Sequence, residues 1–280
     1  MWEVFVIIVL GLVQGASEFL PISSSGHLVV LYNIFNITDN TILLSVVLHV
    51  ATLIAVCICY RKQLVCLIKK PFCKTNLKLI TATIPTVVIA LLLKNLVEKS
   101  FDGTFVTLGF LITALVLVVS QNIQNKSKLQ SNSHFLSKTN SFENNNITNI
   151  NVSYGQALLI GLVQGVAIFP GISRSGSTIA TGLICGVNKS DAADFSFLLS
   201  IPIIVGSMIL EIADVVKGNI TMQFSALSLG VGFVVAFVSG LLAIKLMLKF
   251  VKNKKLTAFS VYLFLLSLFL ILNQFVLGWF

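Results

Sequence analysis

The sequence predicts an all-α polytopic membrane protein with six transmembrane helices and two re-entrant broken-helix hairpins, arranged as an inverted-topology repeat. The composition is the first observation: 56% of the 280 residues are apolar and 10% are charged, which is too little polar surface for a soluble globule. The second is a set of six apolar runs long enough to cross a bilayer. The third is a repeat, because residues 11–26 (GLVQGASEFLPISSSG) return 150 positions later as residues 161–176 (GLVQGVAIFPGISRSG). The two copies share ten of sixteen residues.

The location of the basic residues explains the net charge of +9. Of the nineteen Lys and Arg residues, six fall in 61–78, three in 121–152 and five in 245–255. The positive-inside rule makes these three segments cytoplasmic. The charge therefore records membrane topology, and we expect no nucleic-acid partner. The five cysteines lie in apolar runs or in the first inner loop, where we expect free thiols.

The crossing segments are expected, in chain order, at about 43–60, 79–97, 104–120, 195–213, 225–247 and 257–279. With the basic loops inside, the first, third and fifth segments run inward and the others run outward. Both termini then face the outside of the membrane.

Each copy of the repeat contains helix breakers where a crossing helix would have to be continuous. Pro21 and the serine run after it interrupt the first copy, and Pro170 with Gly171 interrupts the second. Each copy therefore reads as a helix, a break and a short second helix that returns to the same face. The first hairpin, about 1–37, enters from outside and the second, about 154–190, enters from inside, as broken helices do in inverted repeats.

These assignments divide the chain into two inverted halves, residues 1–120 and 154–280. Between them, residues 121–153 hold nine Asn and six Ser with few apolar residues. This composition predicts a flexible cytoplasmic linker.

Gln14 and Glu18 are four residues apart, so they share a helix face that points toward the break at Pro21. An acidic residue inside a membrane is costly and generally marks an ion or substrate site. The alternative is a carboxyl group that is simply protonated, or hydrogen-bonded to backbone freed by the break.

The serine run begins the second short helix of the first hairpin, where hydroxyls and unpaired N–H groups favour an anion. We predict that Ser23 and Ser25 bind phosphate and that Ser24 is reactive. His27 follows Ser24 by three residues, close enough to act as its base or to protonate a leaving oxygen. The alternative is an ordinary helix cap.

Arg174 stands in the second break, flanked by Ser173, Ser175 and Thr178. A guanidinium among hydroxyls at a helix start suits phosphate oxygens, so all four residues are predicted to bind phosphate. The alternative is a salt bridge between Arg174 and Glu18 across the two halves.

A diphosphate at this site would be repelled by Glu18 unless a cation lay between them. We therefore expect a divalent cation, Mg²⁺ or Ca²⁺, held by Glu18 with help from Gln14 and by the oxygens of the substrate. His49, in a crossing helix, and His134, in the linker, are weaker candidates: His49 lines the cavity or pairs with backbone, and His134 is expected to be solvated.

These motifs resemble those of the undecaprenyl-diphosphate phosphatase family, also known as bacitracin-resistance proteins. The likeness runs from GLVQGASEFLPISSSGH at 11–27 through IFPGISRSGSTIATGLICG at 168–186 to FSFLLSIPIIVG at 195–206. The resemblance implies a divalent-dependent enzyme of the bacterial plasma membrane that removes the terminal phosphate of undecaprenyl diphosphate on the periplasmic face. Its product is the monophosphate carrier used for peptidoglycan precursors.

The motifs of that family fall on particular residues of this chain. The resemblance implies that (E/Q)xxxE, the serine and histidine of SSxGH, and PGxSRSxxT correspond to Gln14, Glu18, Ser24, His27, Ser173, Arg174, Ser175 and Thr178. Among these, Glu18, Ser24, His27 and Arg174 would be catalytic. Many relatives have Glu where this chain has Gln14, so one carboxylate is left for the metal.

Other functions compete with this one. The type-2 phosphatidic-acid-phosphatase class also uses SGH and SR motifs, but Ala180 and Ile184 stand where that class has His and Asp. The stronger alternative is a transporter or flippase of the polyprenyl phosphate carrier, because inverted repeats and broken helices are transporter architecture. A serine and histidine pair favours the enzyme. The oligomeric state is left open, and a homodimer is compatible with the sequence.

Overall fold

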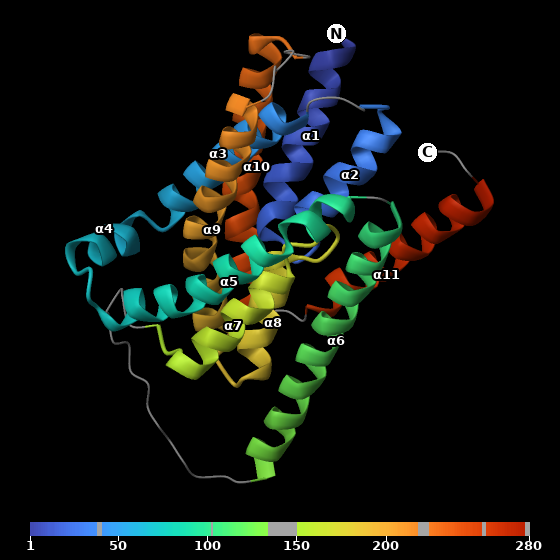
Figure 1. The fold of residues 1–280 in the computed structure, drawn as a ribbon. Helices are drawn as coiled ribbons and strands as arrows, with labels where there is room; N and C mark the ends of the chain where they lie inside the picture. Colours follow the sequence, from blue (N-terminus) through green and yellow to red (C-terminus); the bar gives the residue numbers. More distant parts are fainter. Residues whose placement is uncertain (38–40, 102, 134–149, 218–223, 254–255, 278–280) are drawn as a thin grey trace.

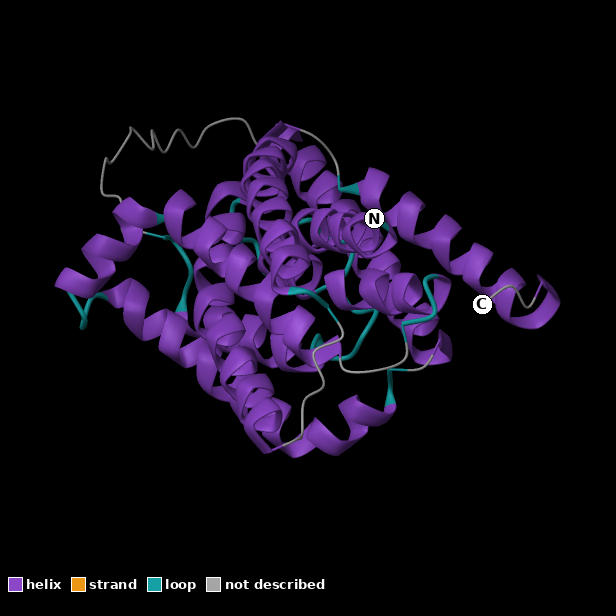
Figure 2. Cartoon of the chain, turned by 90° about the horizontal axis from the view of Figure 1, so that it is seen from above, coloured by secondary structure: helices purple, strands orange, loops and turns teal. Residues whose placement is uncertain are grey.

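The structure, a computed structural model, describes residues 1–37, 41–101, 103–133, 150–217, 224–253 and 256–277. Within these ranges all regular secondary structure is helical, as predicted (Figure 2). The first half contains α1 (Trp2–Phe19), α2 (Ser24–Ile34), α3 (Thr41–Cys59), α4 (Arg61–Lys69), α5 (Lys74–Lys99) and α6 (Gly103–Ser133). The second half contains α7 (Tyr154–Val166), α8 (Arg174–Ile184), α9 (Lys189–Lys217), α10 (Ala226–Asn253), α11 (Thr257–Leu272) and a π-helical turn, Asn273–Leu277.

Among the described residues, seven helices are long and apolar enough to cross a membrane. Six of them, α3, α5, α6, α9, α10 and α11, coincide with the predicted crossing segments. The seventh is α1, whose 18 residues reach spanning length, whereas its repeat counterpart α7 has only 13. The chain is therefore a multi-pass membrane protein, and the re-entrant course of the two hairpins in a bilayer stays a prediction.

Two parts of the chain differ from their predicted form. Helix α6 continues to Ser133, beyond the predicted crossing segment and into the linker predicted at 121–153, which stays a prediction. The reason is local: residues 121–133 contain neither Pro nor Gly, and a helix already formed by an apolar segment extends through polar residues without a breaker. Residues 134–149 of that linker lie outside the described residues. The inner loop at 61–78 contains α4, which the hydropathy pattern did not reveal.

The two halves pack on each other in a reciprocal way. Helix α1 packs against α10 of the second half, and α7 packs against α5 of the first. In Figure 1, α1 runs from the upper end of the molecule toward its middle and α7 runs from the lower end, so that their broken ends meet. This is the arrangement expected of an inverted repeat.

Equivalent glycines make both of these helix contacts possible. A Cβ on Gly11 would lie 2.7 Å from the carbonyl oxygen of Gly232 in α10, and one on its repeat counterpart Gly161 would lie 2.1 Å from that of Ala82 in α5. Only glycine allows the backbones to approach so closely, as at other small-residue interfaces between membrane helices. The shared GLVQG sequence therefore records a shared packing requirement.

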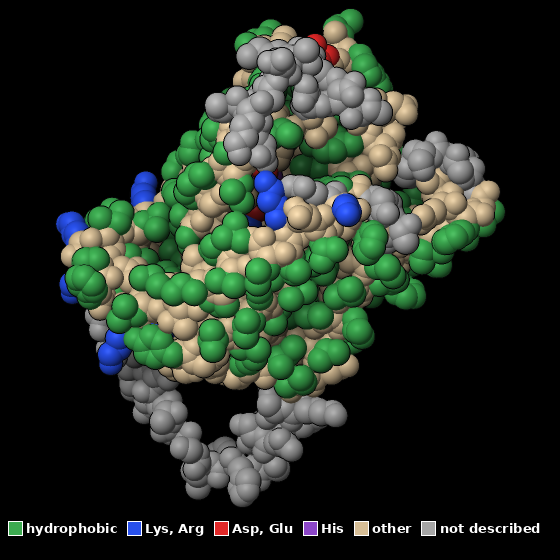
Figure 3. Space-filling view, viewed as in Figure 1, with side chains coloured by type: hydrophobic (Ala, Val, Ile, Leu, Met, Phe, Trp, Pro, Cys, Tyr) green, Lys and Arg blue, Asp and Glu red, His purple; other side chains and the backbone are tan. Residues whose placement is uncertain are grey.

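Large apolar side chains cover the outside of the helix bundle, as Figure 3 shows over most of one face. Only 11% of the spanning window of α5 and 28% of that of α11 is buried inside the protein. Apolar surface on this scale needs lipid around it. Basic side chains gather at the left edge of that view, over α4 and the start of α5.

Candidate active site

The first break ends α1 at Phe19 and starts α2 at Ser24. Ser23 caps α2, because its Oγ accepts a hydrogen bond from the backbone N–H of Gly26 at 3.3 Å. Its φ of 69° lies in the left-handed region, which is strained for a residue with a side chain. Strain of this kind, about 1–3 kcal/mol, persists where the surrounding structure holds it and is found most often at functional sites.

The second break repeats this capping with the same residues. Ser173 caps α8 by accepting from the N–H of Gly176 at 3.0 Å. Its Oγ lies 3.3 Å from that of Ser175, just as Ser23 Oγ lies 3.4 Å from Ser25 Oγ. The two short helices therefore share the same side-chain cap, although Ser173 has an ordinary φ of −77°. Both present their unpaired N–H groups where an anion would be stabilised.

The two breaks are also bonded to each other. Ser175 donates from Oγ to the carbonyl oxygen of Leu20 at 2.9 Å, which satisfies backbone freed where α1 ends. Gly171, with a φ of 86°, passes so close to α6 that a Cβ would lie 2.1 Å from the carbonyl oxygen of Val106. The breaks are thus fixed relative to each other by backbone contacts.

Glu18 is the centre of the polar cluster that forms at the junction. Its Oε1 accepts from Nη2 of Arg174, which also forms the predicted ion pair. Its Oε2 accepts from Oγ of Ser24 at 2.6 Å and from Nε2 of Gln14 at 3.1 Å. The side chains of Glu18 and Arg174 are only 6% and 15% exposed, so solvent screens the pair weakly. The residues predicted in separate halves therefore form one site.

A small pocket of about 50 Å³ opens on this cluster. It is lined by Ser17, Glu18, Ser23, Ser24, Ser25, Ala167, Ile172, Ser173 and Arg174. Four of the predicted phosphate-binding residues are thus in place. The other two are not on its wall: Ser175 bonds to the first break, and Thr178 Oγ1 lies 2.6 Å from Ser196 Oγ and 2.9 Å from the carbonyl oxygen of Arg174. Thr178 therefore supports the first turn of α8 beneath the guanidinium.

His27 does not contact Ser24 in this structure. Its Nδ1 lies 2.8 Å from the carbonyl oxygen of Ser23, and its Nε2 lies 2.7 Å from the hydroxyl of Tyr262 in α11. A carbonyl oxygen only accepts, so Nδ1 carries the proton and Nε2 accepts from Tyr262. The rings of His27 and Tyr262 are stacked, with centroids 5.7 Å apart. The expected pairing of His27 with Ser24 is therefore replaced by a pairing of Ser24 with Glu18.

Gln14 offers an oxygen that could serve a cation. Its side chain is fully buried, and its Oε1 has no hydrogen-bond partner among the described residues. Among the described residues, no group of three or more His, Cys, Asp or Glu side chains could hold a metal ion. An amide oxygen, one carboxylate and hydroxyl oxygens fit a hard cation that takes its remaining ligands from water and substrate, as Mg²⁺ and Ca²⁺ do.

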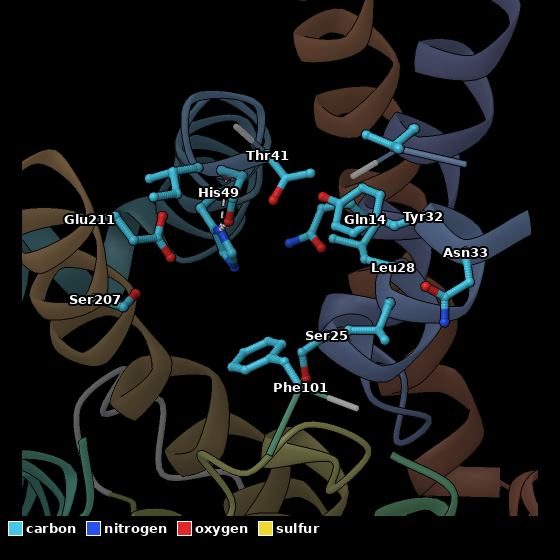
Figure 4. Close-up of a pocket in the computed structure, with 14 residues that line it drawn as sticks. Gln14, Ser25, Leu28, Tyr32, Asn33, Thr41, His49, Phe101, Ser207 and Glu211 are labelled. Carbon is cyan, nitrogen blue, oxygen red and sulfur yellow. Dashed lines mark hydrogen bonds between the residues drawn. The ribbon is translucent and has the colours of Figure 1, made fainter. Parts of the chain in front are cut away.

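A larger cavity of about 570 Å³ adjoins the cluster (Figure 4). Gln14 and Ser25 belong to its wall, and Ser25 also lines the small pocket. The other wall residues come from α2, α3, the segment before α6, and α9; they include Leu28, Tyr32, Asn33, Thr41, Ser45, His49, Phe101, Ser207 and Glu211. His49 both lines this cavity and bonds to backbone, so the two alternatives predicted for it hold together.

The chain is similar in sequence to a family of known proteins. Residues 7–269 match the family model described as bacitracin resistance protein BacA. The chain is 37% identical to an undecaprenyl-diphosphatase of Carboxydothermus hydrogenoformans, over 96% of this chain and 97% of that protein. It is 40% identical to an undecaprenyl-diphosphatase of Treponema denticola, over 95% and 96%. One of Methanosphaera stadtmanae is 36% identical, over 99% of this chain and all of that protein.

Proposed function

The chain belongs to the bacitracin resistance protein BacA family, and on this premise we propose that it is an integral-membrane undecaprenyl-diphosphatase. It hydrolyses undecaprenyl diphosphate to undecaprenyl phosphate and inorganic phosphate. The observation that carries the proposal is the contact of Glu18 with both Ser24 and Arg174. It joins a nucleophile, a proton acceptor and a phosphate-binding cation in one buried cluster. The product is the lipid carrier of peptidoglycan synthesis, and recycling it would confer resistance to bacitracin.

The terminal phosphate is bound at the N-terminus of α8. Arg174 is the first residue of that helix, so its guanidinium and the free N–H groups of the first turn converge on the small pocket. The N-terminus of α2 faces the same pocket through Ser24 and Ser25. Two helix starts and one guanidinium favour the charge that builds up on the equatorial oxygens during phosphoryl transfer.

Ser24 attacks the terminal phosphorus, and its proton passes to Glu18 across the 2.6 Å hydrogen bond. The bond from Oγ to phosphorus forms as the bond to the bridging oxygen breaks, and undecaprenyl phosphate leaves with that electron pair. Water then attacks the same phosphorus, the bond from Oγ to phosphorus breaks, and the proton held by Glu18 returns to Oγ, so inorganic phosphate leaves and the serine hydroxyl is restored. If a quenched reaction with labelled terminal phosphate leaves no label on Ser24, the serine only positions a water molecule and this step is wrong.

Glu18 and Gln14 would hold a divalent cation at the same place. One support is the side chain of Gln14, which bonds to Glu18 through Nε2 while its Oε1 has no partner among the described residues. The other is the net charge of the site once substrate is bound. A diphosphate adds several negative charges to a site whose Glu18 and Arg174 cancel each other. A bound Mg²⁺ or Ca²⁺ would neutralise part of that charge and polarise the phosphoryl oxygens.

The site works from the outer side of the cell membrane in this proposal. Support comes from the basic segments at 61–78 and 245–255, which the positive-inside rule places inside the cell. The wall of the large cavity is built from the opposite ends of the helices, including Thr41, Phe101 and Glu211. In this orientation both termini are outside and the chain resides in the bacterial plasma membrane.

Purified protein in detergent tests the activity. Release of inorganic phosphate from undecaprenyl diphosphate should vanish in Ser24→Ala and Arg174→Ala and should persist in Ser260→Ala. Ser260 is the control because it is a buried serine outside the polar cluster, and its hydroxyl donates within its own helix, to the carbonyl oxygen of Thr257. Tight binding of the lipid with no phosphate release from the parent protein would support the transporter and contradict the enzyme.

A further inference from the structure

The large cavity is the chamber in which most of the substrate must lie. The small pocket measures about 50 Å³ and the adjoining cavity about 570 Å³, so only the terminal phosphate fits beside Arg174. The second phosphate and the start of the prenyl chain then extend past Gln14 and Ser25 into the larger space. Side chains on that wall contact the leaving group rather than the phosphate that is attacked.

His49 presents a reactive nitrogen to this chamber. Its Nδ1 lies 2.9 Å from the carbonyl oxygen of Ser45 and 3.1 Å from the hydroxyl of the same residue. The carbonyl oxygen can only accept, so Nδ1 keeps a proton and Nε2 is the nitrogen that exchanges one. Figure 4 shows the ring pointing into the cavity between Gln14 and Glu211. Among the described residues, no hydrogen bond is formed by Nε2.

Titratable side chains from other helices lie around the ring of His49. The titratable groups that share its cavity wall are Tyr32 on α2 and Glu211 on α9. On α1, Glu18 is near enough to interact with it electrostatically. Carboxyl groups of two other helices therefore lie near the ring, and the open cavity gives it access to water.

His27 is placed differently, although it is the histidine of the sequence motif. Its two nitrogens are engaged by Ser23 and Tyr262, and it lines neither the small pocket nor the large cavity. A proton donor for the leaving group has to face the chamber. Of the two histidines that the structure describes, only His49 does so.

We propose that His49 is the general acid that protonates the departing prenyl phosphate, an inference that rests on the proposed phosphatase function. As the bond between the terminal phosphorus and the bridging oxygen breaks, its electron pair stays on that oxygen. The proton on Nε2 of His49 moves to the same oxygen. His49 returns to neutral imidazole, with Nδ1–H still bonded to Ser45, and takes its next proton from cavity water.

The substitution His49→Gln tests this role, because glutamine keeps a hydrogen-bonding amide and cannot transfer a proton. We expect kcat to fall by about 10²-fold or more, with KM changed less than about threefold, since general acids contribute on that scale. In His49→Ala, added imidazole should enter the cavity and restore part of kcat in proportion to the imidazolium concentration.

The same substitution at His134, in the predicted linker, is the matched control and should leave kcat unchanged. The inference is overturned if His49→Gln keeps kcat within about twofold, if added imidazole fails to restore kcat in His49→Ala, or if the main defect of His49→Gln is a loss of affinity for a non-hydrolysable methylene diphosphate analogue. Its failure is distinct from that of the phosphatase proposal. If the parent protein releases phosphate and Ser24→Ala does not, the phosphatase stands whatever His49→Gln shows.

Discussion

Removing one member of the Glu18 and Arg174 pair should destabilise the protein far more than removing both. In Arg174→Met, the carboxylate of Glu18 stays buried with only the neutral donors Ser24 and Gln14. Breaking a buried ion pair from one side costs about 3–5 kcal/mol. Arg174 is also the first residue of α8, where a positive charge opposes the helix dipole by about 0.3–1 kcal/mol, and the substitution regains that amount. The expected net loss is therefore about 2–5 kcal/mol.

The double variant Glu18→Gln, Arg174→Met removes both charges and keeps similar side-chain volumes. It should unfold within about 1 kcal/mol of the parent protein, because a buried pair replaced by neutral groups is often close to neutral in stability. Reversible unfolding in mixed micelles of dodecyl maltoside and dodecyl sulfate measures all three proteins. An Arg174→Met protein as stable as the parent, or a double variant less stable than the single one, would refute the reasoning.

Three further predictions concern the scaffold and the cation. Gly161→Ala should lower the thermal unfolding temperature, because its Cβ would lie 2.1 Å from the carbonyl oxygen of Ala82, whereas Gly155→Ala, with no atom within 4 Å, should not lower it. Tyr262→Phe removes the hydroxyl that bonds the α2 histidine and should cost about 0.5–1.5 kcal/mol in the same unfolding assay; no change would contradict the contact. Gln14→Glu adds a second carboxylate and should tighten Ca²⁺ binding measured by equilibrium dialysis, and unchanged or weaker binding would argue against a cation there.

The local sequence was enough to predict the breaks, the caps and the spans. Pro21 and the serine run end one helix and start the next through contacts within a few residues, and apolar runs fix the crossing helices by length. The repeat also predicted which residues distant in the sequence lie close together. Once the two copies were placed in opposite orientations, Glu18 and Arg174 had to approach each other, and the structure confirms that they do.

Contacts between distant segments could not be predicted from the sequence. Tyr262 bonds to His27 across 235 positions, and no pattern around either residue marks the partner. The predicted contact between His27 and Ser24 is not formed for a related reason. A spacing of three residues allows contact on a helix, but the bent backbone at Ser23 gives His27 a carbonyl partner instead. The sequence left open whether His49 lines the cavity or pairs with backbone, because its neighbours on the cavity wall come from α1, α2 and α9.

The central claim is that both halves of the repeat build one catalytic site. A double-mutant cycle on kcat/KM for phosphate release, with Ser24→Ala in the first half and Arg174→Lys in the second, tests it directly. When two residues act together in one step, substituting the second after the first causes little further loss of kcat/KM. The kcat/KM of the double variant should therefore lie within about threefold of that of the less active single variant. If the fold losses in kcat/KM of the two single variants multiply to give the loss of the double variant, the two residues act independently. That result would contradict a shared site.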